Sequence, residues 1–213
     1  MARAFLTSRI LRWLLLVLLA ALALQLFFIG RIALMAVVDP SSTTFERSEA
    51  WRIVTEKGAL RWRQQWVPYA QISDHLKRAV IASEDGDFIN HDGVEWEAIE
   101  KAWQKNTQAE ELAAKRAART PPGRPAPATK APKIVGGSTI TQQLAKNLLL
   151  SGERTLLRKG QEFVLTMALE LLLSKQRILE IYLNHVEWGE GVFGAEAAAQ
   201  HYYRKPASKL SAY

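Results

Sequence analysis

The chain has 213 residues, a net charge of +7 and an isoelectric point near 9.7. This length is enough for one domain with a substantial core, and the positive charge favours nucleic acid, a membrane surface or a phosphorylated substrate as partner. The sequence contains no cysteine, which excludes a disulfide framework, a thiolate nucleophile and a cysteine-based zinc site.

The first long apolar segment covers residues 13–38 and is interrupted only by Gln25 and Arg31. Its first part alone approaches the ~20 residues that cross a bilayer core of ~30 Å. Arginines precede it, so the positive-inside rule predicts a basic cytoplasmic tail over residues 1–12, a transmembrane anchor over 13–38 and an external domain over 39–213. A cleaved signal peptide is the alternative, but the apolar run continues well past its small-residue cleavage site at 21–23.

Beyond the anchor the hydrophobic periodicity is helical. Residues 72–83 gather their apolar side chains on one face. Residues 163–183 are apolar nearly all round, as expected of a helix at the centre of a domain, and Ser174 either breaks this helix or caps a second one. Strand patterns are weak and confined to residues 51–66. These features predict a mainly α-helical fold.

Residues 109–133 depart from this pattern. They begin helix-prone and basic and then become rich in proline and alanine, so they cannot bury enough apolar surface to fold alone. We interpret them as a flexible insertion, with a basic arm that contacts anionic lipid headgroups as the alternative.

The segment GGSTITQQLAKN, residues 136–147, predicts a helix start, because Thr139 and Gln142 have the spacing of a capping box. A helix that begins here buries Ile140, Leu144 and Leu148. A glycine-led helix start lined with amides and a lysine suits a phosphate or a sugar, although an ordinary surface helix shares this pattern. The polar side chains on its other faces are Ser138, Gln142, Gln143, Lys146 and Asn147.

A charged stripe follows at Arg154, Arg158 and Glu162, with Lys159 beside it. A solvated face with one weak ion pair would give the same spacing. Glu162, however, opens the most apolar helix of the domain, where an acid without a partner would be costly.

A second acid, Glu84, ends another apolar segment in the stretch EDGDFINHDG. Two carboxylates suggest glycosidic chemistry, in which one acts on a hydroxyl or water and the other stabilises charge. The cations suggest an anionic leaving group such as pyrophosphate. No Walker A loop occurs, and an enzyme anchored in a membrane could take a lipid-linked donor.

Five segments in order resemble the successive motifs of the peptidoglycan glycosyltransferases, over residues 66–210. The family includes the N-terminal domain of bifunctional penicillin-binding proteins and the short monofunctional biosynthetic transglycosylases, which the chain resembles most. The transpeptidase signatures S-x-x-K and K-T-G are absent. The five segments are EDGDFINHDG, GGSTITQQLAKN, RKGQE, KQRILEIYLN and GEGVFGAEAAAQHYYRKPASKL.

The resemblance implies a lysozyme-like, two-lobed domain behind the single transmembrane helix. It also implies an inverting reaction in which the growing lipid-pyrophosphate glycan passes to the 4-hydroxyl of lipid II and forms a β-1,4 bond. Glu84 is then the general base, and Glu162 is the second catalytic glutamate. Arg158 and Lys159 hold the pyrophosphate with Glu162, which is the candidate ligand of a divalent metal, Mg or Mn. No organic cofactor is implied.

The resemblance assigns the other site residues as well. Asp85, Phe88 and His91 shape the loop around Glu84. The implied partners are lipid II, the lipid-linked glycan and the membrane, with cell-wall synthesis or division proteins as candidates and no nucleic acid. The implied location is the bacterial inner membrane, with a cytoplasmic N-terminus and a periplasmic domain. The substrate contacts are Ser138, Gln142, Gln143, Lys146 and Arg154.

Two departures from the family pattern bear on these expectations. The proline- and alanine-rich segment is longer than usual, and the sequence stops at Tyr213, where the family normally continues with more helix. The alternatives are a membrane-anchored lytic glycosidase and, if the chain is truncated, an inactive cell-wall scaffold.

Overall fold

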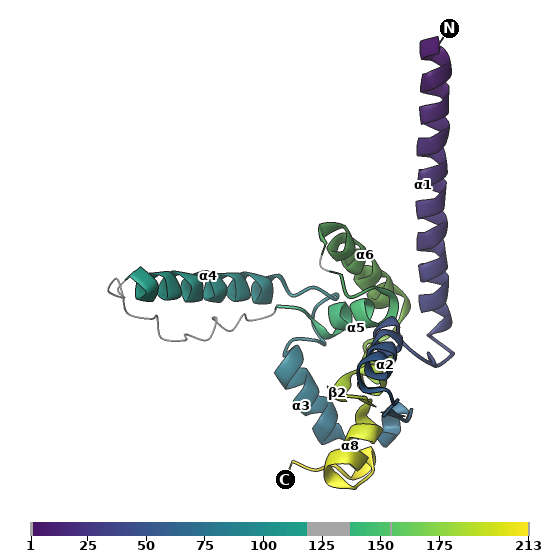
Figure 1. Cartoon of the computed structure of the whole chain (residues 1–213). Helices are drawn as coiled ribbons and strands as arrows, with labels where there is room; N and C mark the ends of the chain where they lie inside the picture. Colours follow the sequence, from purple (N-terminus) through teal and green to yellow (C-terminus); the bar gives the residue numbers. More distant parts are fainter. Residues whose placement is uncertain (1, 119–136, 154, 213) are drawn as a thin grey trace.

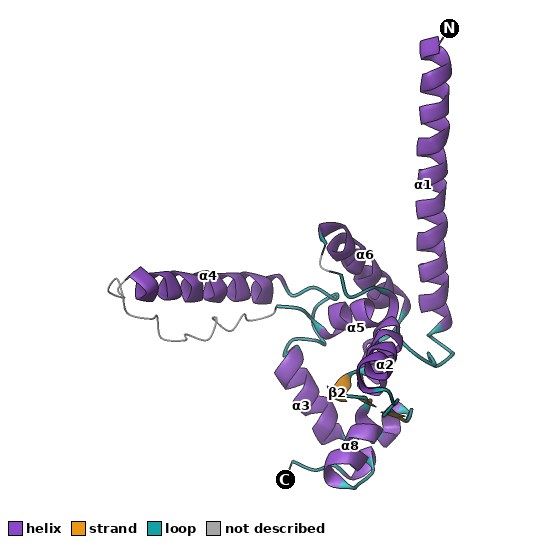
Figure 2. Ribbon diagram, viewed as in Figure 1, coloured by secondary structure: helices purple, strands orange, loops and turns teal. Residues whose placement is uncertain are grey.

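The computed structural model describes residues 2–118, 137–153 and 155–212, and helices dominate it (Figure 2). The prediction of a mainly α-helical fold is confirmed. Two short 3-10 helices lie at Tyr69–Gln71 and Ala207–Lys209. The α-helices are α1 (Ala2–Leu34), α2 (Thr44–Lys57), α3 (Asp74–Glu84), α4 (Trp96–Ala118), α5 (Ile140–Leu149), α6 (Leu156–Leu172), α7 (Lys175–His185) and α8 (Ala195–Tyr203).

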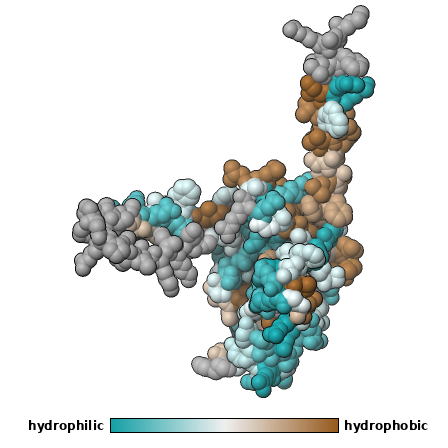
Figure 3. Space-filling view, in the orientation of Figure 1, coloured by the Kyte–Doolittle hydropathy of each residue, from teal (hydrophilic) through white to brown (hydrophobic). Residues whose placement is uncertain are grey.

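Helix α1 rises from the body as a single rod (Figure 1). Its residues Arg9–Leu34 are long and apolar enough to cross a membrane, and hydrophobic side chains cover much of it where it stands clear of the body (Figure 3). Its lower end is different, because Ile32 and Met35 are buried against the domain.

The helix ends at Leu34, four residues before the end of the apolar segment. Arg177 explains the early end. Its Nε donates to the Met35 carbonyl at 2.8 Å and its Nη2 to the Val38 carbonyl at 3.2 Å. A side chain from α7 thus satisfies carbonyls that the next helical turn would otherwise have used, a long-range contact that composition does not reveal.

Helix α5 lies at the centre of the body and packs against α2, α6 and α7. Its predicted buried face is confirmed, since Ile140, Leu144 and Leu148 are fully enclosed. Thr44 Oγ1 of α2 donates to the Leu148 carbonyl at 3.0 Å, which fixes α2 beside α5.

The apolar stretch 163–183 forms two helices, and Ser174 caps the second through a hydrogen bond from the Arg177 amide. The expectation that the first is buried all round is wrong. Leu165 and Leu169 are buried, whereas Phe163, Val164 and Leu171 are exposed. Helix α6 packs on α5, α1 and α7, and apolar side chains on its exposed surface are not enclosed by the described residues.

A small three-stranded sheet lies against α8. Strand β3 (Val192–Phe193) lies between β1 (Arg63–Gln64), which is parallel to it, and β2 (Glu187–Gly189), which is antiparallel. Of the weak strand candidates in residues 51–66, only β1 forms a strand, because residues 51–57 belong to α2. Strands of two or three residues are too short to show alternation, so β2 and β3 have no sequence signal.

Helices α3 and α4 frame the loop that carries the first motif. On α3, Val80 is buried, as is Ile72 just before it, whereas Ala79 and Ser83 are exposed. Helix α4 projects sideways from the body (Figure 1). It includes the first part of the predicted insertion, up to Ala118, and residues 119–133 of that insertion lie outside the described residues.

Candidate active site

A cleft of about 540 Å³ lies between α2, α5 and the start of α6. Most of the substrate contacts predicted from the sequence meet on its walls, although they come from segments far apart in the chain. Arg154 lies outside the described residues. The predicted residues that line the cleft are Ser138, Gln142, Gln143, Lys146, Arg158, Lys159 and Glu162.

The capping box at the start of α5 places the first of these groups. Thr139 Oγ1 accepts the Gln142 amide hydrogen at 3.2 Å, and Gln142 Oε1 accepts the Thr139 amide hydrogen at the same distance. Ile140, Leu144 and Leu148 turn inward, so the helix presents Gln143 and Lys146 to the cleft. The predicted polar stripe therefore faces one cavity.

Glu162 is buried at the opposite wall, with 3% of its surface exposed. Arg158 Nη1 donates to its Oε2 at 2.8 Å, and Lys159 Nζ donates to its Oε1. Helical spacing of three and four residues brings both cations to one carboxylate. The result is a cluster of one anion and two cations at the cleft wall, which suits an anionic group.

Glu84 is the last residue of α3, and its side chain is exposed. It lines a second cavity of about 350 Å³ with Tyr182 and Trp188. Gln143 connects the two cavities, because it lines the larger cleft while its Nε2 donates to Glu84 Oε2 at 3.0 Å. The two predicted glutamates therefore line separate cavities, and a hydrogen bond from Gln143 on the wall of the larger cleft links that cleft to Glu84.

Asp85 ties the end of α3 to the start of α5. Its buried carboxylate accepts the Ile140 amide hydrogen at 2.9 Å through Oδ2, and Oδ1 lies 2.8 Å from His91 Nε2. His91 Nδ1 accepts the Gly93 amide hydrogen, so Nε2 carries the proton and donates it to Asp85. This tether sets Glu84 next to Gln143.

Phe88 completes the loop. Its ring is fully buried, and Lys175 Nζ lies 4.6 Å from the ring centroid. The same ammonium donates to the His91 carbonyl at 2.5 Å and to Glu170 Oε1 at 2.8 Å. Asp85, Phe88 and His91, which were expected to shape the loop around Glu84, thus contact α5 and Lys175 and line neither of the two cavities.

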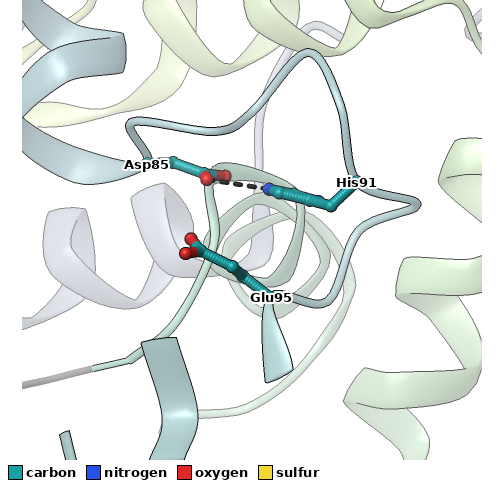
Figure 4. A group of neighbouring side chains, drawn as sticks. All are labelled: Asp85, His91 and Glu95. Atoms are coloured by element: carbon teal, nitrogen blue, oxygen red, sulfur yellow. Dashed lines mark hydrogen bonds and ion pairs between the residues drawn. The ribbon is translucent and has the colours of Figure 1, made fainter. Parts of the chain in front are cut away.

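Asp85, His91 and Glu95 form a cluster whose ligand-capable atoms lie within 4.8 Å of one another. Figure 4 shows the Glu95 carboxylate directed toward the hydrogen-bonded Asp85 and His91. Both Asp85 oxygens already accept hydrogen bonds, and the ring nitrogen nearest to them carries a proton. The three side chains could bind a cation together only if these hydrogen bonds were broken.

Sequence reasoning did not single out Thr44, Phe45 and Ser48, which form the α2 wall of the cleft. A signal for them exists. Thr43 and Glu46 make a second capping box, and the T-x-x-E spacing could have predicted the helix start. That α2 lies beside α5 depends on tertiary contacts, which the sequence does not show.

Two patterns known from nucleotide sites also occur in the sequence. In Asp85-Gly86-Asp87, the first carboxylate is occupied within the loop, as described above. In Gly189-x-Gly191-x-x-Gly194, β3 separates the second and third glycines, unlike a phosphate-binding strand–turn–helix. A Cβ at Gly191 or Gly194 would meet a backbone carbonyl oxygen at 2.1 or 2.6 Å, so close packing accounts for these two glycines.

Comparison with known proteins places these features in a family. The family model described as Transglycosylase matches residues 52–115 and 126–213. A biosynthetic peptidoglycan transglycosylase of Burkholderia thailandensis is 52% identical over 194 residues, which cover 91% of this chain and 68% of the relative. One of the same description from Cupriavidus metallidurans is 53% identical over 193 residues, covering 89% and 72%.

Proposed function

Because the chain belongs to the transglycosylase family, it is a glycosyltransferase that polymerises peptidoglycan glycan chains, and we propose that Glu84 activates the acceptor while the α5–α6 cleft holds the donor pyrophosphate. The domain is lysozyme-like, as its family implies. The observation that carries the proposal is the position of Gln143, which donates a hydrogen bond to Glu84 and also lines the cleft that contains Arg158 and Lys159.

The acceptor is lipid II, and its 4-hydroxyl oxygen attacks the anomeric carbon of the lipid-linked glycan. A β-1,4 glycosidic bond forms, the bond to the pyrophosphate oxygen breaks, and the hydroxyl proton passes to the Glu84 carboxylate. Attack opposite the leaving group inverts the configuration at the anomeric carbon. Glu84 suits this role because it is exposed at the mouth of a cavity, where a hydroxyl can come within hydrogen-bond reach.

The leaving group gains negative charge as its bond to the sugar breaks. Lys146, Arg158 and Lys159 line the cleft that would receive it, and cations aimed at developing charge contribute more in an enclosed site than in water. Ion pairs with the buried Glu162 carboxylate hold Arg158 and Lys159 in place. A lytic enzyme needs a protonated acid for its leaving sugar and has no use for such a cluster.

A divalent metal at the pyrophosphate stays a prediction, and Glu162 does not fit the part of its ligand. Both of its carboxylate oxygens face a cation already, and two neighbouring positive charges oppose a third. In this arrangement Arg158 and Lys159 supply the charge that a metal would supply. In the cluster of Asp85, His91 and Glu95, the Asp85 and His91 side chains are likewise engaged in internal hydrogen bonds.

The membrane is the second partner. We infer that α1 is a single-pass anchor in the inner membrane, with residues 1–12 in the cytoplasm and the domain in the periplasm. Arg9 and Arg12 precede the apolar part of the helix, which supports this orientation. The exposed apolar side chains of α6 lie on a helix that packs against α1, as suits an enzyme whose substrates are lipids.

The experiment that tests the function is Glu84→Gln, which keeps the side-chain shape but cannot accept the proton. General base catalysis contributes ~10²–10⁴-fold, so lipid II consumption should fall by at least ~100-fold while the melting temperature stays unchanged. Glu56→Gln is the matched control, because Glu56 is an exposed glutamate on α2 outside the cleft. Near-normal polymerisation by Glu84→Gln would remove this residue from the mechanism.

A further inference from the structure

Tyr182 lies on α7 with 3% of its surface exposed, and its hydroxyl reaches the cavity that contains Glu84. Its Oη donates to Gln143 Oε1 at 3.0 Å. Burial, and then the nearby charges of Glu84 and Asp85, raise the pKa of Tyr182 above its ordinary value. The phenol therefore keeps its proton at every working pH and always has a hydrogen to donate.

The Gln143 amide has one orientation in this setting. Two acceptors face its nitrogen: Glu84 Oε2 at 3.0 Å and the Ser138 carbonyl at 3.4 Å. The Tyr182 hydroxyl faces its oxygen. A flipped amide would point its oxygen at a carboxylate and a carbonyl, so the three neighbours together fix which end donates.

The consequence falls on Glu84. Gln143 occupies one carboxylate oxygen, Oε2, whereas Oε1 makes no hydrogen bond within the described part of the chain. A charge-assisted hydrogen bond at one oxygen restricts the rotation of the carboxylate and leaves the other oxygen open. Oε1 is thus the atom left to receive a proton, and the orientation of the base depends on the Gln143 amide.

We propose that Tyr182 is a positioning residue for the transfer reaction, acting through Gln143 to hold Oε2 of Glu84 and leave Oε1 to take the acceptor proton. The proposal rests on the proposed function, because it assumes that Glu84 is the base. It adds a chain of two hydrogen bonds, from α7 through α5 to the end of α3, that orients this base.

Tyr182→Phe tests the proposal by removing only the hydroxyl. One hydrogen bond that aligns a catalytic group is worth about a kcal/mol, so kcat should fall roughly 5- to 10-fold. The KM for lipid II should change little, because the substitution removes only the bond from Tyr182 to Gln143 and keeps the Gln143 and Glu84 side chains themselves. Thermal melts run in parallel show whether the fold is kept.

Tyr202→Phe is the matched control. Its hydroxyl donates to the Trp188 carbonyl at 2.9 Å, so the same substitution removes one hydrogen bond from the same fold without touching Gln143. It should leave both kcat and the KM for lipid II as in the wild type. An equal effect of both substitutions would indicate a general loss of packing and would overturn the proposal.

A double-mutant cycle with Gln143→Met isolates the route. Methionine keeps the length of glutamine without its amide, so Tyr182→Phe should have no further effect in that background. Additive losses would show that Tyr182 acts independently of Gln143 and would refute the chain. If Glu84→Gln is inactive while Tyr182→Phe matches the wild type, the positioning role fails and the proposed function stands. An active Glu84→Gln removes both.

Discussion

At the scale of single residues, Glu162 shows how much of a site depends on burial. Its carboxylate is enclosed while its two partners differ: the Arg158 side chain is 15% exposed and that of Lys159 is 52% exposed. Removing a partner from a buried ion pair leaves an uncompensated charge and is strongly destabilising. Removing a half-exposed partner has a much smaller effect on stability.

The two cations are therefore expected to separate structure from catalysis. Lys159→Ala should reduce lipid II consumption by ~10-fold or more, because a cation near the developing charge is lost, and should leave the melting temperature nearly unchanged. Arg158→Ala should lower both activity and melting temperature, and Arg158→Lys should restore only part of each, since lysine lacks the forked donor geometry. Activity assays and thermal melts on the same preparations make the comparison.

Lys101→Ala is the control for Lys159→Ala, because Lys101 is an exposed lysine paired with Glu97 on α4. Its activity should match the wild type. Full activity of Lys159→Ala would place that ammonium outside the donor site. The sequence spacing predicts that Arg158, Lys159 and Glu162 meet, but only the packing of α6 on α5 reveals which of them is buried.

At the scale of secondary structure, the start of α5 joins three parts of the site. Thr139 caps the helix and its Oγ1 also donates to the Gly93 carbonyl at 2.6 Å, while Asp85 accepts from Ile140. The capping box could be predicted from four letters of sequence. The bonds to Gly93 and Asp85 could not, because they join residues 46 and 55 positions apart.

This double role makes the loss of Thr139 more costly than the loss of a cap such as Ser174, which bonds only within its own helix in the described part of the chain. Thr139→Ala should lose ~1 kcal/mol for the cap and about another 1 kcal/mol for the bond to Gly93. Thr139→Ser keeps the hydroxyl and should lose little. Ser174→Ala removes a cap whose described bond goes only to its own helix and should lose only the first amount. Urea unfolding measures all three, and equal losses for Thr139→Ala and Ser174→Ala would contradict the tether.

Helix α6 marks the limit of periodicity as a guide. A helix that is apolar on every face is expected in the centre of a domain, and the same composition arises when one face packs on protein and another is left open. Phe163 and Leu171 are open in this way. The sequence identifies the helix and its charged start, but the environment of each face depends on what lies beside it.

At the scale of the whole molecule, the lower part of α1 packs against the domain and the rest of the helix extends away from it (Figure 1). Gln25 and Gln161 exchange two amide hydrogen bonds, at 2.7 and 3.0 Å, between α1 and α6. Gln25 lies roughly 15 Å along the helix axis from Met35, at 1.5 Å a residue. The apolar segment is evident from composition, whereas the partner of its one amide is not.

Breaking this pair should loosen the anchor from the domain. Gln25→Leu or Gln161→Leu leaves one amide without its partner, and such bonds in lipid contribute ~1 kcal/mol. The double variant places two leucines together and should recover most of the loss. Thermal unfolding in lipid nanodiscs measures the cycle. Losses that simply add would mean that the two amides stabilise the protein independently.

The packing of α1 against α6 makes two sides of the enzyme unequal, because α1 covers one side of α6 and leaves another open. One flank of α6 is occupied by the anchor from Gln25 down to Met35, so lipids cannot pass between them. In the membrane arrangement proposed above, a lipid-linked substrate must then reach the cleft from a side of α6 that α1 does not occupy. In that arrangement, the rate at which the enzyme meets its lipid-linked substrate depends on the rotational orientation of the enzyme in the membrane. A second protein bound on the α1 side would leave the route to the cleft open.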